Sequence, residues 1–164
     1  MIIKPKWRIT TVLFLLAVSL HAQTAAELDT LLETDAVCAA VAARFVLEAA
    51  EILPPGLSGG EAETAAFELA VSKGWIKGSA SDNATLKSTA FLVMKAFNLK
   101  GGLMYSIFKN PRYAYREMVY RKIIQERSDP AQAVSGPRLL RIIDRASVYA
   151  GKVFGIDDDT GGAG

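Results

Sequence analysis

Apolar residues recur every three or four positions in several segments of the chain, a period typical of amphipathic helices. The pattern predicts a short helix over residues 25–32, longer helices over about 38–52, 61–74 and 85–97, and a last helix that begins after Ser135. Thr85 and Ser135 suit the N-cap position because a hydroxyl can accept a hydrogen bond from an unpaired amide. Cys38 is a poorer cap, so Thr34 or Asp35 is the alternative start of the 38–52 helix. The sequence therefore predicts an all-α fold.

The same spacing predicts which side chains face the interior. In the segment 61–74 the inward residues are Ala66, Phe67, Ala70 and Val71, and in 85–97 they are Leu86, Ala90, Val93, Met94 and Phe97. We interpret Trp75, Ile76, Ile123 and Ile124 as core anchors. The run from Leu103 to Phe108 is apolar at almost every position and does not show the alternation of apolar and polar residues that is typical of an amphipathic helix. We expect it to cover the core, and contact with a partner is the alternative.

One helix-loop-helix pattern occurs two and a half times, at a spacing of about 48 residues. Residues 66–97 align with 114–146, and residues 38–49 align with the second helix of that unit. We place a half repeat at about 34–53 and full repeats at about 61–99 and 108–150. A chain of this length can bury one substantial core, so we expect one compact helical domain over residues 23–155.

The first 22 residues are typical of a secretory signal peptide. A cationic start (Lys4, Lys6 and Arg8) precedes the apolar stretch Ile9 to Leu20, with a cleavage site before Gln23. An uncleaved anchor is the alternative, although the apolar stretch is shorter than the ~20 residues of a spanning helix. We expect an exported protein, periplasmic or associated with the cell wall, without a stable membrane span after cleavage. Residues 156–164 lack apolar content, which predicts a disordered tail.

Charge is distributed unevenly along the chain. Nine acids and one base lie between Glu27 and Glu68, whereas ten bases and four acids lie between Lys109 and Lys152. This favours anionic partners for the second full repeat, or head-to-tail association. The alternative is that the helix faces of opposite sign are simply solvated.

The titratable residues argue against catalysis. The only histidine, His21, lies in the predicted signal, and the only cysteine is Cys38. Without histidine the processed chain has no Ser-His or Cys-His nucleophile pair. Glu61, Glu63, Glu68, Glu117 and Glu126 could supply a carboxylate pair, but no motif isolates any of them. We therefore expect no enzyme, no cofactor and no metal site.

The order of motifs resembles that of the S-layer homology domain. Gly74-Trp75-Ile76 or Lys122-Ile123-Ile124 follows a helix, and a polar loop leads to Ala84-Thr85 or Val134-Ser135. The stretch Phe108-Lys109-Asn110-Pro111-Arg112-Tyr113-Ala114 is similar to that family's opening Phe-x-Asp followed by Trp-Ala. The resemblance covers about residues 34–150. The whole chain is also similar to small exported envelope proteins of spirochaetes.

The resemblance implies noncovalent attachment to cell-wall polysaccharide. In the family, an Ile-Thr-Arg-Ala-Glu stretch presents an arginine to an anionic sugar. Here Leu86 and Gly136 occupy the arginine position, while Ser88 and Arg138 occupy the glutamate position. Lys87 and Arg138 are nearby cations that could replace the arginine, although lysine offers a point charge where arginine offers a bidentate fork.

Tyrosines alternate with bases in the second full repeat, as an acidic glycan site requires. On a helix, Arg112, Tyr115, Arg116 and Val119 share one side, while Tyr113 and Tyr120 share another, so some tyrosines must be core. We expect a non-enzymatic envelope module that binds peptidoglycan or another anionic cell-wall glycan. The predicted ligand-binding residues are Arg112, Tyr113, Arg116, Arg121, Lys122, Arg138 and Lys87.

The alternative function is protein–protein interaction or assembly, with an envelope protein as partner. Its predicted contact residues are Leu103, Met104, Tyr105 and Phe108, which belong to the apolar run. Nucleic acid is not an expected partner of an exported protein.

Overall fold

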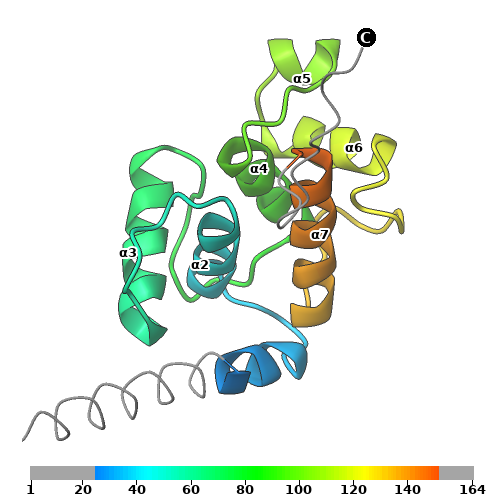
Figure 1. Cartoon of the computed structure of the whole chain (residues 1–164). Helices are drawn as coiled ribbons and strands as arrows, with labels where there is room; N and C mark the ends of the chain where they lie inside the picture. The colour runs from blue at the N-terminus through cyan, green and yellow to red at the C-terminus, as the bar shows by residue number, and fades with distance from the viewer. Residues whose placement is uncertain (1–24, 152–164) are drawn as a thin grey trace, which may run out of the picture.

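The computed structural model describes residues 25–151, which form helices joined by loops (Figure 1). Residues 25–32 are helical, followed by α2 (Ala39–Ala49), α3 (Gly59–Ser72), α4 (Leu86–Ala96), α5 (Leu103–Ile107), α6 (Pro111–Tyr120) and α7 (Gly136–Tyr149). No strand occurs in this part of the chain, which confirms the all-α prediction. None of its helices is long and apolar enough to cross a membrane. The predicted signal peptide and the predicted disordered tail lie outside the described residues.

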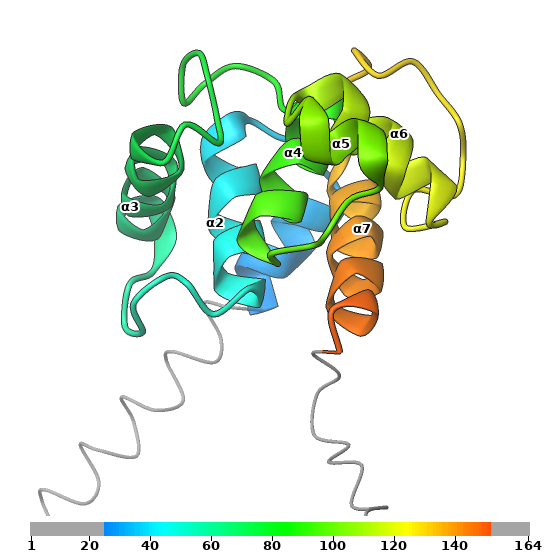
Figure 2. The ribbon, with the colours of Figure 1, turned by 90° about the horizontal axis from the view of Figure 1, so that it is seen from above.

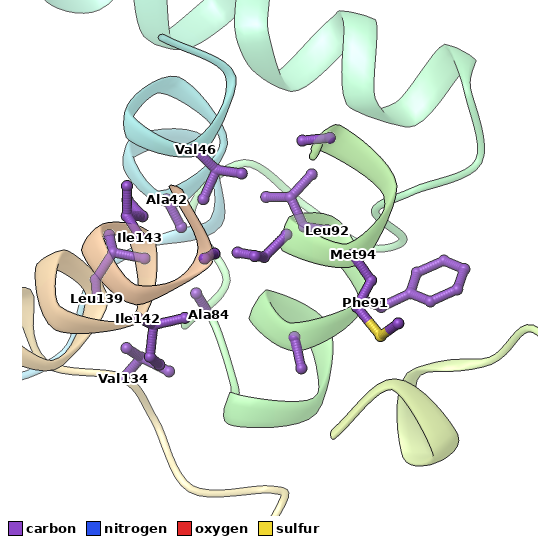
Figure 3. Close-up of a cluster of buried hydrophobic side chains, with 14 of the residues drawn as sticks. Ala42, Val46, Ala84, Phe91, Leu92, Met94, Val134, Leu139, Ile142 and Ile143 are labelled. Atoms are coloured by element: carbon purple, nitrogen blue, oxygen red, sulfur yellow. The ribbon is translucent and has the colours of Figure 1, made fainter. Parts of the chain in front are cut away.

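Three helices, α2, α4 and α7, surround the centre of the core. Figure 3 shows Val46 on α2 and Leu92 on α4 pointing into the space between the helices, with Leu139, Ile142 and Ile143 on α7 beside it. The outer helices α3 and α6 pack against α2 and α4 respectively (Figure 2). All five residues predicted to face inward in the segment 85–97 are buried, four of them on α4 and the fifth, Phe97, at its C-cap, which confirms that part of the pattern.

A closed ring of backbone hydrogen bonds joins the segments that precede the three central helices. The amide of Val37 donates to the carbonyl of Val134 (2.8 Å), Val134 donates to Ala84 (2.9 Å), and Ala84 donates to Val37 (2.8 Å). All three residues are buried, so the ring satisfies polar groups that water cannot reach. Each residue lies directly before one of the aligned positions 38, 85 and 135. The three aligned positions thus each follow a residue of the same hydrogen-bonded ring. The resemblance to the S-layer homology domain stays a prediction.

The ring also decides where α2 begins. Because Val37 is held in extended backbone by Val134 and Ala84, the helix cannot start upstream of it. The alternative start at Thr34 or Asp35 is therefore wrong: α2 begins at Ala39, and Cys38 is its N-cap. Cys38 makes no side-chain capping bond and is partly exposed, not buried inside the helix.

The two predicted N-caps differ in chemistry. Thr85 forms a capping box, in which its hydroxyl accepts from the Ser88 amide (3.3 Å) and the Ser88 hydroxyl accepts from the Thr85 amide (2.9 Å). Ser135 occupies the same place before α7, but its side chain makes no capping hydrogen bond. The sequence therefore identified both positions, while only Thr85 acts through its side chain.

Two predictions of burial are wrong. Val71 is 42% exposed because α3 turns a narrow face of Ala62, Ala66 and Ala70 toward α2. The run from Leu103 to Phe108 does not cover the core, because it forms the one-turn helix α5, which buries only Tyr105. Tyr105 is consequently not available at the surface as one of the predicted partner-contact residues.

Candidate functional site

A basic groove lies between α6 and the loop 125–130. Its volume is about 550 Å³, and its lining residues are Arg112, Tyr115, Arg116, Val119, Tyr120, Arg127, Ser128 and Pro130. Three of these are arginines and none is an acid. The Tyr120 side chain is 84% exposed and offers an aromatic face to solvent. The groove therefore combines cations with a planar apolar surface.

The periodicity of α6 produces one wall of this groove. Arg112, Arg116 and Tyr120 are spaced four residues apart, so they lie along one side of the helix. The opposite side buries Ala114 and Met118 in the core. The side-chain oxygen of Asn110 caps the helix by accepting from the Tyr113 amide (3.1 Å), and Pro111 sits in the first turn, where its missing donor is harmless. The wall is thus fixed at its N-terminal end.

The loop that carries Arg127 is held from two sides. The Tyr115 hydroxyl donates to the Ser128 carbonyl (2.5 Å) and accepts from the Ser128 amide (3.0 Å). Arg138 on α7 donates to the Ser128 hydroxyl (2.8 Å) and to the Glu126 carbonyl (3.1 Å). These bonds fix the backbone on both sides of Arg127, so the second wall of the groove is also built into the fold.

A second basic pocket, of about 180 Å³, lies between α7 and residues 123–126. Arg138, Arg141 and Arg145 follow one face of α7 and line it, together with apolar residues and one acid, Glu126. Arg145 donates to the Ile123 carbonyl at the long distance of 3.5 Å. The loop 125–130 therefore has arginines on both of its sides, in two separate pockets.

The structure brings together only some of the predicted ligand-binding residues. Arg112 and Arg116 line the groove, and Arg138 lies behind the loop in the second pocket. Tyr113 does not line either pocket: its ring stacks on that of Phe108, with centroids 5.6 Å apart, and the Arg116 guanidinium lies 5.9 Å from its centroid. Tyr113 therefore lies beside the groove and contributes no lining surface.

Arg121 is engaged inside the protein. It pairs with Glu117 (2.7 Å), donates to the Tyr149 hydroxyl (2.8 Å) and also to the Lys100 carbonyl. Its guanidinium carbon lies 4.8 Å from the Tyr149 ring centroid. These contacts join α6 to α7 and to the α4–α5 connection. We therefore assign Arg121 a structural role, in place of the ligand-binding role predicted from sequence.

Lys122 and Lys87 are exposed but line neither basic pocket. Lys122 has a positive φ of 59° directly after the C-cap of α6, and Lys87 lies in the first turn of α4. Sequence reasoning did not select Arg127, Arg141 or Arg145. The spacing of Arg138, Arg141 and Arg145 on one helix face was readable from the sequence, whereas the position of Arg127 depends on the loop.

The two positions that align with the arginine of the S-layer homology stretch cannot present a side chain to solvent in this fold. Leu86 is fully buried in the core. Gly136 is also buried, and a Cβ placed on it would lie 1.6 Å from the carbonyl oxygen of Leu31. No side chain fits there because the helix 25–32 ends against the start of α7. Any cation that meets a sugar must therefore come from elsewhere in the chain.

Comparisons with protein-family models, curated proteins and solved structures found no match. Among residues 25–151, no group of three or more histidine, cysteine, aspartate or glutamate side chains could hold a metal ion. The proposed function therefore rests on the geometry of the basic groove.

Proposed function

We propose that the protein is an exported, non-enzymatic envelope module that binds peptidoglycan or another anionic cell-wall glycan in the groove between α6 and the loop 125–130. The observation that carries this proposal is the gathering of Arg112, Arg116 and Arg127 around Tyr120 with no acid in the lining. Uncompensated cations in a concave site favour an anionic ligand.

The chemistry of the groove suits an acidic sugar. A guanidinium can bind a carboxylate or phosphate with two parallel hydrogen bonds, which fixes orientation as well as charge. The exposed ring of Tyr120 offers an apolar face of the kind on which a sugar ring packs, while its hydroxyl stays in water. The fixed loop reduces the entropy lost on binding, because Arg127 is already positioned through Ser128.

Co-sedimentation with purified peptidoglycan sacculi tests this proposal. The buried core of the described residues extends from Leu31 to Ala146, so a chain that begins at Gln23 keeps all of it. The test variant replaces the three groove arginines: Arg112→Gln, Arg116→Gln and Arg127→Gln. The matched control removes three exposed cations that do not line the groove: Lys73→Gln, Lys77→Gln and Lys100→Gln.

We expect saturable pelleting of the wild-type chain at physiological salt, loss of pelleting in the arginine variant, and wild-type behaviour in the lysine control. Binding to any polyanion weakens with salt, so low-salt pelleting alone does not count as support. Equal pelleting of both variants at every salt concentration would refute the groove as the site. Absence of saturable pelleting would refute glycan binding itself.

A further inference from the structure

The helix α5 presents an apolar ridge to solvent. Four of its residues are strongly exposed: Leu103 (76%), Met104 (51%), Ile107 (60%) and the C-cap Phe108 (49%). Figure 1 shows α5 at the outer edge of the molecule, beyond α4 and α6, and Figure 2 shows the same face from above. An exposed apolar patch of this kind marks an interaction surface.

The ridge is held in place by the rest of the fold. Tyr105 is buried and packs into the core, and burial raises the pKa of its hydroxyl. The Phe108 ring stacks on Tyr113 of α6, with an interplanar angle of 23°. A Cβ on Gly101 would lie 2.2 Å from the Tyr105 ring, so the chain passes closely under it. The exposed side chains are therefore displayed on a fixed support.

A cluster of lysines lies on the other side of the same helix. A pocket of about 420 Å³ is lined by Lys95, Lys100 and Lys109 together with Tyr105 and Ser106 of α5. No acid belongs to its lining. Lys95 lies over the Phe91 ring at 5.3 Å, which orients its stem along the apolar surface. One short helix thus has apolar side chains outward and lines a cationic pocket with its remaining residues.

We propose that α5 docks on the surface of an anionic lipid bilayer, with its apolar ridge in the interfacial region and the lysine pocket over the headgroup phosphates. The observations favour a bilayer because it is the partner that offers an apolar interior directly beneath a layer of negative charge. The ridge is a single helical turn, short for the roughly 800 Å² per partner of a stable protein interface. A bilayer engages such a ridge when nearby cations add electrostatic attraction.

Vesicle flotation tests this inference, using the chain from Gln23 onward so that the apolar segment 9–20 cannot contribute. The vesicles are phosphatidylcholine alone and phosphatidylcholine mixed with phosphatidylglycerol. One variant carries Leu103→Glu and Ile107→Glu, and its control carries the same charge at two less exposed apolar positions away from α5, Leu28→Glu (39% exposed) and Val71→Glu (42% exposed). A second variant carries Lys100→Gln and Lys109→Gln, and its control carries Lys73→Gln and Lys77→Gln.

We expect binding to the anionic vesicles only, weakened at least about tenfold by the glutamates on α5, which remove apolar burial. Removal of the two pocket lysines should weaken binding by about fivefold per lysine, the effect of one basic residue near an anionic surface. Neither control should change it. The groove variant that tests glycan binding leaves α5 intact, so the two proposals can fail separately.

Failure of the wild-type chain to float with anionic vesicles would overturn the inference. So would flotation that is unchanged by the glutamates on α5. Sedimentation equilibrium of the same proteins tests the alternative that the ridge contacts a second copy of the chain. Self-association that is abolished by Leu103→Glu and Ile107→Glu, without vesicle binding, would assign the ridge to that contact. It would also overturn the inference that α5 docks on a bilayer.

Discussion

Arg44 on α2 forms an ion pair with Glu27, seventeen residues earlier in the helix 25–32. The same guanidinium pairs with Glu48 (2.8 Å) and approaches Glu63 on α3 (3.9 Å), so the one base of the acidic front half joins three helices. Its side chain is only 8% exposed. Burial alone would lower the pKa of Arg44, but the hydrogen bonds to Glu27 and Glu48 and the negative charge of these two carboxylates together outweigh burial and raise the pKa above its ordinary value.

Replacement of Arg44 by methionine should therefore destabilise the fold. Three partly buried carboxylates would lose their common cation, which we expect to lower the free energy of unfolding by about 2 kcal/mol, less than for a fully buried pair because the glutamates are partly exposed. Urea denaturation followed by circular dichroism measures this. Arg44→Lys keeps the positive charge but lacks the forked guanidinium, so its free energy of unfolding should lie between those of the wild type and Arg44→Met. An unchanged midpoint for Arg44→Met would contradict the role of this cluster.

The two N-caps should respond differently to the same kind of change. Thr85→Ala removes the hydroxyl that accepts from the Ser88 amide and should lower the free energy of unfolding by about 1 kcal/mol, although the backbone amide of residue 85 can still donate to the Ser88 hydroxyl. Ser135→Ala removes a hydroxyl that makes no capping bond, so we expect a change below about 0.5 kcal/mol. Thermal or urea unfolding of the two variants in parallel gives the comparison. Equal losses would show that the difference in capping is not present in solution.

Gly136→Ala tests the contact between the helix 25–32 and the start of α7. The added Cβ would lie 1.6 Å from the Leu31 carbonyl oxygen, so the backbone must shift, and we expect a loss of about 3 kcal/mol or more. Gly60→Ala is the matched control on α3, because its Cβ meets nothing within 4 Å. That change should raise stability slightly through the better helix propensity of alanine. A neutral Gly136→Ala would mean that the helix 25–32 does not end against α7.

Tyr115→Phe separates the position of the loop from the charge of the groove. The change removes both hydrogen bonds to the Ser128 backbone but no cation. Amide hydrogen exchange in residues 125–130 should become faster, and the affinity for sacculi should fall by about three- to tenfold because only Arg138 then holds the loop that carries Arg127. Tyr113→Phe, whose hydroxyl makes no hydrogen bond to a described residue, is the control. Unchanged exchange in Tyr115→Phe would refute the tether.

The helical period of the apolar residues predicted most of the helices, because this period reflects which side of a helix is buried. On α4 the period predicted Leu86, Val93 and Met94 to be buried, and all three are. The period failed for Val71, and the apolar content of the run 103–108 failed to predict its exposure, because burial depends on which neighbour covers the face. The period also could not predict that Cys38 is extended and lies outside the helix, because the backbone ring through the neighbouring Val37 involves residues about 50 and 100 positions away.

The candidate site was predictable only in part. Arg112 and Arg116 were found because four-residue spacing places them on one face of α6. The internal contacts of Arg121 were not predictable because its partners, Tyr149 and the Lys100 carbonyl, are far away in sequence. Arg127 was missed because the loop position is set by Tyr115 and Arg138 through Ser128. Charge composition pointed to the half of the chain that contains the basic groove, but it could not distinguish cations that line the groove from cations paired inside the structure.

The most direct test of the central claim is an amide NMR titration of the chain from Gln23 with muropeptides released from purified peptidoglycan. We predict saturable shift changes concentrated in residues 112–120 and 126–130, which line the groove, and their loss in the variant with Arg112→Gln, Arg116→Gln and Arg127→Gln. Changes of equal size spread over α3, or no saturable change at millimolar ligand, would contradict glycan binding in this groove.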